Sequence, residues 1–300
     1  MGKLFKKIYK EGFIMTIKNE GKVVSFINMK GGVGKTTLCV GIGEYLASFE
    51  DKKILFLDVD PQFNTTQTLM NYFDLEEDYM NNFRQNKTIR KLFESISSIS
   101  EVPRLPEPEE VIIKMEKNPN INLICGNIDL IFDDNQGDGA KSRRIKKFIE
   151  EHKLREEYDF IFIDCPPTIS FYTDAALNAS DYYLVPNRID RYSILGIKLL
   201  KQVIDRLSFD EDLYIEPLRI IYTMVRNPTQ KSEALRNMFE SASIVKEIDI
   251  FSEKTRYVND LMVGLQGNIS SNYKKSKEDI EAVSLEFLEL VERKNSHEFS

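Results

Sequence analysis

The chain has 300 residues, of which 42% are hydrophobic and 30% are charged, and its formal net charge of −7 corresponds to a pI of about 5.2. This balance excludes a general polycation, so any binding to nucleic acid has to come from a local basic patch. The 3 cysteines form no CxxC pair, and with only 2 histidines the sequence offers no disulfide framework, zinc site or histidine triad.

Residues 1–20 precede the first apolar strand and are rich in lysine. Leu4, Phe5 and Ile8 lie among these lysines and are compatible with a short basic amphipathic helix that touches lipid or DNA. We expect instead a mobile tail followed by one domain over 21–300, and a working start at Met15 is a further alternative. The sequence has neither an apolar run long enough to span a membrane nor a secretory leader, so we expect a cytoplasmic protein without stable membrane insertion.

Apolar runs and helix-like stretches alternate along the rest of the chain. Non-alternating apolar runs suit parallel strands that are buried on both faces, and the βαβ order predicts an α/β fold: a doubly wound, mostly parallel sheet with helices on both faces. The stretch near 75–120 is more polar and contains a proline cluster, so we interpret this excursion from the βαβ pattern as an insertion or a flexible segment. We expect strands at 23–27, 53–58, 121–125, 160–164, 182–185, 218–224 and 244–250, and helices at 38–48, 87–95, 141–157, 195–207, 231–241 and 277–293.

A glycine-rich loop lies between the first strand and the first helix. Its glycines allow successive backbone N–H groups to surround phosphate oxygens, at the positive end of the helix dipole. Lys35 would neutralise the outer phosphates and Thr36 would offer its hydroxyl to Mg²⁺, as in a P-loop. The alternative is a glycine-rich turn that binds no ligand. The expected nucleotide contacts are Lys30, Gly31, Gly32, Val33, Gly34, Lys35, Thr36 and Thr37.

Acidic residues follow two of the expected strands. Asp58 ends the run 53–58 and Asp60 follows it, and Asp164 ends 160–164 ahead of two prolines. Because ligands bind at the carboxyl ends of parallel strands, these acids are placed to meet a metal ion or a water molecule beside the phosphates. Taken alone, Asp58 and Asp60 favour such a site only somewhat over an ordinary turn, and Asp164 fits a turn at the strand end equally well.

Together these motifs resemble the ParA/MinD family of ATPases with a deviant Walker A box. Met29 stands where the general P-loop has glycine, and Lys30 matches the family's additional lysine. The resemblance covers about 23–293 and implies ATP and Mg²⁺ as cofactors. It also implies that Lys30 acts in trans across a homodimer, beside Lys35, and that Asp60 of the LDVDPQ segment positions the attacking water. By the same resemblance Thr36, Asp58 and Asp164 lie near Mg²⁺.

The resemblance is looser in the second half of the chain. Ile189 replaces a proline that family members commonly carry, so the role of Asp190 near the dimer interface is less secure. The family places adenine near Met224 and near Phe251. Its basic patch would fall on candidate DNA contacts, although solvated surface explains such residues equally well: Arg226, Lys254, Arg256, Lys274 and Lys275.

By resemblance, the function is ATP-dependent DNA partition. ATP would drive dimerisation and non-specific binding to DNA at the nucleoid, and a ParB-like centromere-binding partner would stimulate slow hydrolysis to ADP and phosphate. The alternative is a MinD-like switch that acts on a membrane or a protein cargo, but the C-terminus is acid-rich rather than a basic membrane helix. A metabolic enzyme related to nitrogenase reductase is disfavoured by the cysteine positions.

Overall fold

The computed structural model describes residues 6–10, 13–17, 20–94, 104–133 and 141–297. Most of its strands form an eight-stranded sheet of order β10-β9-β8-β3-β7-β4-β6-β5. All neighbouring pairs are parallel except β5 with β6, which confirms the predicted α/β fold. The strands are β3 (Lys22–Phe26), β4 (Ile54–Asp58), β5 (Ile113–Lys114), β6 (Ile121–Ile124), β7 (Phe160–Asp164), β8 (Tyr182–Asn187), β9 (Glu216–Val225) and β10 (Ile250–Arg256).

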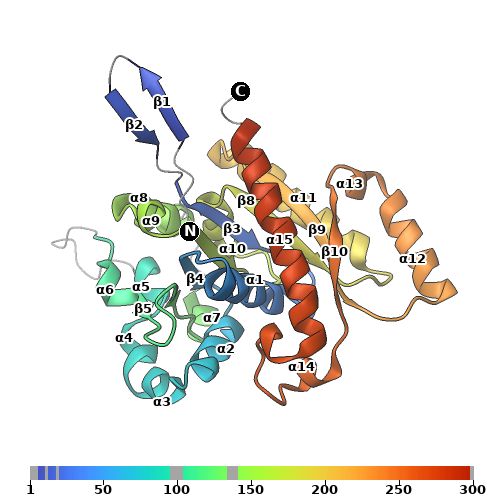
Figure 1. Cartoon of the computed structure of the whole chain (residues 1–300), viewed down its shortest axis with the longest axis horizontal. Helices are drawn as coiled ribbons and strands as arrows, with labels where there is room; N and C mark the ends of the chain where they lie inside the picture. Colours follow the sequence, from blue (N-terminus) through green and yellow to red (C-terminus); the bar gives the residue numbers. More distant parts are fainter. Residues whose placement is uncertain (1–5, 11–12, 18–19, 95–103, 134–140, 298–300) are drawn as a thin grey trace.

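Helices cover both faces of the sheet (Figure 1). Because side chains alternate along a strand, each central strand contributes to two separate cores. Val24 and Phe26 belong to the core under α1 (Lys35–Phe49), α2 (Asn64–Tyr72) and α15 (Lys274–His297). Val23 belongs to the opposite core, under α8 (Arg144–Glu151), α9 (Leu154–Glu157), α10 (Phe171–Ala179) and α11 (Ser193–Glu211).

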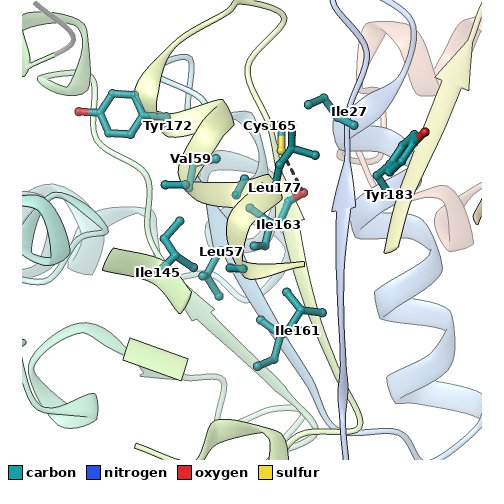
Figure 2. Close-up of a cluster of buried hydrophobic side chains, with 14 of the residues drawn as sticks. Ile27, Leu57, Val59, Ile145, Ile161, Ile163, Cys165, Tyr172, Leu177 and Tyr183 are labelled. Carbon is teal, nitrogen blue, oxygen red and sulfur yellow. Dashed lines mark hydrogen bonds between the residues drawn. The ribbon is translucent and has the colours of Figure 1, made fainter. Parts of the chain in front are cut away.

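The core under α8, α9, α10 and α11 extends to the carboxyl end of β7. Figure 2 shows Ile161 and Ile163 of this strand beside Leu57 of β4, with Leu177 of α10 and Ile145 of α8 packed over them. All five side chains are at most 1% exposed. Burial of this kind contributes about 1.5–3 kcal/mol for each large aliphatic side chain and holds the strand ends, and therefore the site, in place.

The described parts of the 75–120 excursion pack against the body of the protein. Its short elements bury Ile89, Leu92, Val111 and Met115. Pro108 starts a helix whose capping box joins Glu107 and Glu110, so this proline begins regular structure rather than ending it. Pro103 lies outside the described residues. The elements are α3 (Glu76–Asp78), η1 (Tyr79–Phe83), α4 (Arg84–Asn86), α5 (Arg90–Phe93) and α6 (Pro108–Val111).

One expected strand was placed wrongly, and one alternative considered at the N-terminus does not form. Residues 243–246 form α13 (Ser243–Lys246), and the strand expected at 244–250 begins only at Ile250. The apolar run was misread because Val245 is buried against the core as part of a helical turn. At the N-terminus, β1 (Lys6–Lys10) and β2 (Phe13–Ile17) form an antiparallel hairpin, so the helix considered there is absent from 6–10. The expected mobility of 1–20 stays a prediction.

The remaining elements are α7 (Leu130–Asp133), η2 (Lys141–Arg143), α12 (Gln230–Ser241), α14 (Asn259–Val263) and η3 (Ser270–Asn272). Within the described part of the chain, no helix has both the length and the apolarity that crossing a bilayer requires.

Candidate functional site

The glycine-rich loop joins β3 to α1 at the carboxyl end of the sheet. Gly32 and Gly34 have φ values of 69° and 83°, the left-handed region that glycine adopts without strain. Gly34 precedes Lys35, the first helical residue, and the first turn of α1 contains no acidic residue and no side-chain cap. The free N–H groups and the helix dipole therefore favour an anion at this helix start.

The loop lines a pocket of about 420 Å³. Its lining combines the loop and Asp60 with the apolar side chains of Met224, Leu261 and Met262. This combination suits a ligand that has a highly charged part and a flat, less polar part. The complete lining is Gly31, Gly32, Val33, Gly34, Lys35, Thr36, Thr37, Asp60, Gln62, Asn64, Gln67, Thr68, Pro167, Met224, Leu261, Met262 and Asn268.

The two lysines of the loop are placed differently. Lys35 lines the pocket and is only 7% exposed. Lys30 is absent from the lining: its ammonium group makes an ion pair with Asp190 and donates to the carbonyl of Arg188 at 3.3 Å. Partial burial is the largest single influence and would raise the pKa of Asp190, but the hydrogen bonds from Lys30 and the N–H of Tyr192 and the nearby positive charges together hold the pKa below its ordinary value. Ile189 therefore does not prevent this loop from holding Asp190 beside Lys30.

Asp164 meets two hydroxyl groups at the end of β7. Its Oδ2 accepts hydrogen bonds from Thr36 at 2.7 Å and from Thr65 at 2.8 Å, while its Oδ1 is buried and has no partner among the residues that the structure describes. Burial raises the pKa of this carboxyl to about 6, against the lowering effect of the Thr36 hydroxyl. An oxygen acceptor without a partner next to a threonine hydroxyl fits Mg²⁺, which prefers oxygen ligands and neighbouring waters.

Asp60 and Asp58 have different surroundings although they are two residues apart. Asp60 lines the pocket, is 6% exposed and accepts a hydrogen bond from the N–H of Gln62 at 2.9 Å. Asp58 lies behind the pocket, where its Oδ2 accepts from the N–H and the hydroxyl of Thr66 at 2.8 and 2.7 Å. Burial raises the pKa of both carboxyls. The structure thus brings Thr36 and Asp164 together but keeps Asp58 as a support for the loop that carries Asp60.

The two residues expected to contact adenine lie in different places. Met224 lines the pocket with a φ of 53°, and its neighbour Thr223 donates to the carbonyl of Val33 at 2.7 Å. Phe251 does not reach the pocket because it is buried in the core, 4% exposed. The sequence reasoning missed Leu261, Met262 and Asn268. They lie in a short stretch that the sequence analysis assigned to no element, so only the folded arrangement shows that they line the pocket.

The expected DNA contacts gather around the ends of β9 and β10 and the start of α15. Arg226 stacks on the ring of Tyr257 at 3.9 Å, and Lys254, Lys274 and Lys275 are exposed. Arg256 is engaged within the chain, since Glu278 and Asp279 accept hydrogen bonds from its guanidinium at 3.0 and 2.8 Å. This internal pairing reduces the charge that Arg256 can offer to a phosphate.

The fold and the loop define a P-loop nucleotide hydrolase. Comparison with known families narrows the class: the family model described as "AAA domain" matches residues 21–215. The sporulation initiation inhibitor protein Soj of Bacillus subtilis is 30% identical over 201 residues, 65% of this chain and 70% of that protein. The chain therefore belongs to the ParA/Soj family of partition ATPases, as the sequence resemblance predicted.

Other relatives agree with this assignment. The chromosome-partitioning ATPase Soj of Treponema pallidum is 29% identical over 71% of this chain and 75% of that protein. The match to the chromosome partitioning protein ParA of Myxococcus xanthus, 28% identical, spans 65% of this chain but only 63% of that protein's length.

Solved structures share the fold at low identity. A putative plasmid partition protein of Borrelia burgdorferi, bound to AMPPNP, superposes with a TM-score of 0.69 at 20% identity over 90% of this chain and 99% of that one. Cobyrinic acid a,c-diamide synthase of Mycobacterium smegmatis, with an ATP analogue and magnesium, has the same TM-score of 0.69 at 18% identity over 88% of this chain and 92% of that one. Since these identities are low, the likeness establishes the fold alone.

Proposed function

We propose that this partition-type ATPase binds Mg·ATP in the pocket described above, dimerises on it, and in that state binds DNA without sequence preference. A ParB-like partner then stimulates hydrolysis and release. The names of the curated relatives support the partition role. The observation that carries the proposal is the separation of the two loop lysines, because Lys35 lines its own pocket whereas Lys30 is held outside it.

Several residues in and beside the pocket have a role in this scheme. The loop N–H groups and Lys35 bind the phosphates, and the apolar residues around Met224 take the base. Thr36 and Asp164 would hold Mg²⁺, which when bound neutralises charge on the phosphate oxygens. Asp60 accepts a hydrogen bond from the attacking water and so directs it toward the γ-phosphorus, while burial keeps competing water from its carboxylate.

Lys30 would complete the site of the second subunit. To do so its ammonium group has to leave Asp190 and Arg188 and reach the phosphates bound by the partner, where it would stabilise charge as an arginine finger does. Hydrolysis by a monomer is therefore slow. When the dimer closes, the Lys30 ammonium group exchanges Asp190 and Arg188 for the phosphates bound by the partner. DNA binding then depends on the basic surfaces of the two subunits together.

The test is retention of random-sequence duplex DNA by the purified protein with Mg²⁺ and either ATP or ADP. We expect retention with ATP only, a steep loss with rising salt as counterions are released, and no retention by Lys30→Ala. Lys146→Ala, which removes an exposed lysine on α8, is the matched control and should behave as the parent. If ATP binds and a dimer forms but DNA is ignored in every state, the DNA part of the proposal is wrong and a membrane or protein cargo takes its place.

A further inference from the structure

A buried carboxylate on α1 takes no part in the scheme above. Glu44 is 2% exposed, although it lies in the third turn of the helix that follows the phosphate loop. Its Oε1 accepts hydrogen bonds from Ser48 at 3.0 Å and Tyr72 at 3.5 Å, and its Oε2 accepts one from Ser271. Acidic side chains are rarely buried so fully, and three hydroxyl donors reduce the cost of burying this one.

The partners of Glu44 come from the elements on either side of the pocket. Tyr72 ends α2, the helix that begins four residues after Asp60. Ser271 belongs to η3, which directly follows the pocket residues Leu261, Met262 and Asn268. One carboxylate thus joins the phosphate-loop helix to α2 and to the segment that carries apolar residues of the pocket lining.

The segment 260–273, which contains η3, is a compact unit held together by its own hydrogen bonds. The Tyr273 hydroxyl donates to the carbonyl of Gly267 and accepts from the N–H of Gln266, each at 2.7 Å, and Asn272 donates to the carbonyl of Gln266 at 2.6 Å. These bonds fix the internal shape of the segment but not its position on the protein. Its position depends on its contacts with α1, with α15 and with α2, where an added Cβ on Gly267 would lie 3.3 Å from Asn71.

The attachment to α1 has two parts. At Gly41, an added Cβ would lie 2.8 Å from Ile280 of α15 and 3.1 Å from the hydroxyl of Ser270, so α1 and η3 are in direct contact there. One turn further along the helix, Glu44 holds Ser271. Packing at Gly41 limits the distance between the elements, and the directional bond from Ser271 sets their rotation.

We propose that Glu44 is a positioning residue for the base-binding side of the nucleotide pocket, and this rests on the proposed ATP site. The carboxylate is not part of the pocket lining. It acts through Ser271, which places Leu261 and Met262 at a fixed distance from the phosphate loop. The phosphate contacts belong to the loop itself, so Glu44 governs binding of the base and leaves the triphosphate contacts unchanged.

The test compares a ligand that has a base with one that lacks it. Dissociation constants of ATP and of inorganic tripolyphosphate, both with Mg²⁺, are measured by titration calorimetry on the full chain. For Glu44→Ala we expect ATP to bind about tenfold more weakly, about 1.4 kcal/mol, with tripolyphosphate binding within about twofold of the parent. The KM for ATP should rise accordingly, while kcat at saturating ATP changes by less than about twofold.

Three further variants make the result specific. Glu44→Gln keeps an oxygen acceptor and should recover most of the affinity, whereas Ser271→Ala should reproduce most of the loss and remains informative if Glu44→Ala does not fold. Ser48→Ala removes the partner on the same helix and should bind ATP as the parent does. In a double-mutant cycle, Glu44→Ala and Ser271→Ala should be non-additive.

Equal weakening of ATP and tripolyphosphate in Glu44→Ala and Ser271→Ala, or no weakening of either, would overturn the inference. Failure of the parent protein to bind ATP at all would instead remove the proposed function beneath it. The two failures are therefore distinguishable in one set of titrations.

Discussion

The ends of β4 and β7 can be compared directly because Asp58 and Asp164 are register partners on neighbouring parallel strands. Both are fully buried and both follow an apolar run. Asp58 is enclosed by the loop that follows it, since Thr66 donates from both its N–H and its hydroxyl. Among the described residues, Asp164 accepts only from the threonines 36 and 65 and retains a buried oxygen without a partner. Equivalent positions in the sheet thus serve different purposes: one carboxylate shapes a loop and the other is available to a ligand.

The largest expected effect is that of replacing Asp60, which lies on the loop that Asp58 supports. Asp60→Ala should reduce partner-stimulated hydrolysis by about 10³-fold, because a positioned carboxylate of this kind contributes about 10²–10⁴ to the rate. Binding of ATP should change by less than about threefold, since the loop N–H groups are intact. Single-turnover hydrolysis and equilibrium binding measure the two quantities. A variant that loses both in parallel would assign Asp60 to binding rather than to catalysis.

The second effect is a pH dependence of stability in the metal-free protein. Burial raises the pKa of Asp164 to about 6 from its ordinary value of 3.8, and it raises that of Asp58 as well. The folded chain therefore holds these protons more tightly than the unfolded chain. Stability is greatest below pH 3.8 with respect to Asp164 and falls as the pH rises through about 6, by about 3 kcal/mol.

Urea unfolding in EDTA between pH 4 and 7 measures this dependence. Asp164→Asn, which cannot ionise, should show a flatter profile and should be more stable than the parent at pH 7 in the absence of metal. A variant profile that is as steep as that of the parent would assign the dependence to other groups.

The smallest effect separates the two neighbouring threonines. Thr66→Val leaves Asp58 with one donor fewer and leaves the N–H of Gly126, which donates to this hydroxyl at 2.7 Å, without its acceptor. We expect a loss of about 1–3 kcal/mol in the free energy of unfolding. Thr65→Val should instead change the Mg²⁺ concentration required for nucleotide binding, because Thr65 bonds to Asp164. Equal effects of both substitutions on stability and on Mg²⁺ dependence would remove the distinction between the two carboxylates.

The sequence could predict the centre of the fold because local physics dominates there. The runs that became β4 and β7 are apolar at almost every position, as burial on both faces of a parallel sheet demands, and each ends in its aspartate. The phosphate loop could be recognised for the same reason, because its glycines, lysine and threonine have to lie within a few residues of one another. Neither feature depends on distant parts of the chain.

The edge of the sheet and the apolar part of the pocket lining could not be predicted in this way. β10 is an edge strand with the sequence IFSEKTR, too polar to be recognised, while the apolar residues before it form α13. Phe251 is the one residue of this strand that is buried, and it packs into the core. Leu261 and Met262 reach the pocket only because η3 and α15 pack on α1. Ser271 of η3 and Glu44 of α1, which form a hydrogen bond there, are more than 200 positions apart in the chain.

The pocket is built from residues 31 through 268, nearly the whole length of the chain. The phosphate loop and the residues Leu261 and Met262 are separated by more than 200 positions in the chain. Loop closure over such separations is slow and comes late in folding. A nucleotide that contacts both parts of the lining therefore stabilises the folded state and none of its partly folded precursors, so that ATP favours the last folding step by mass action.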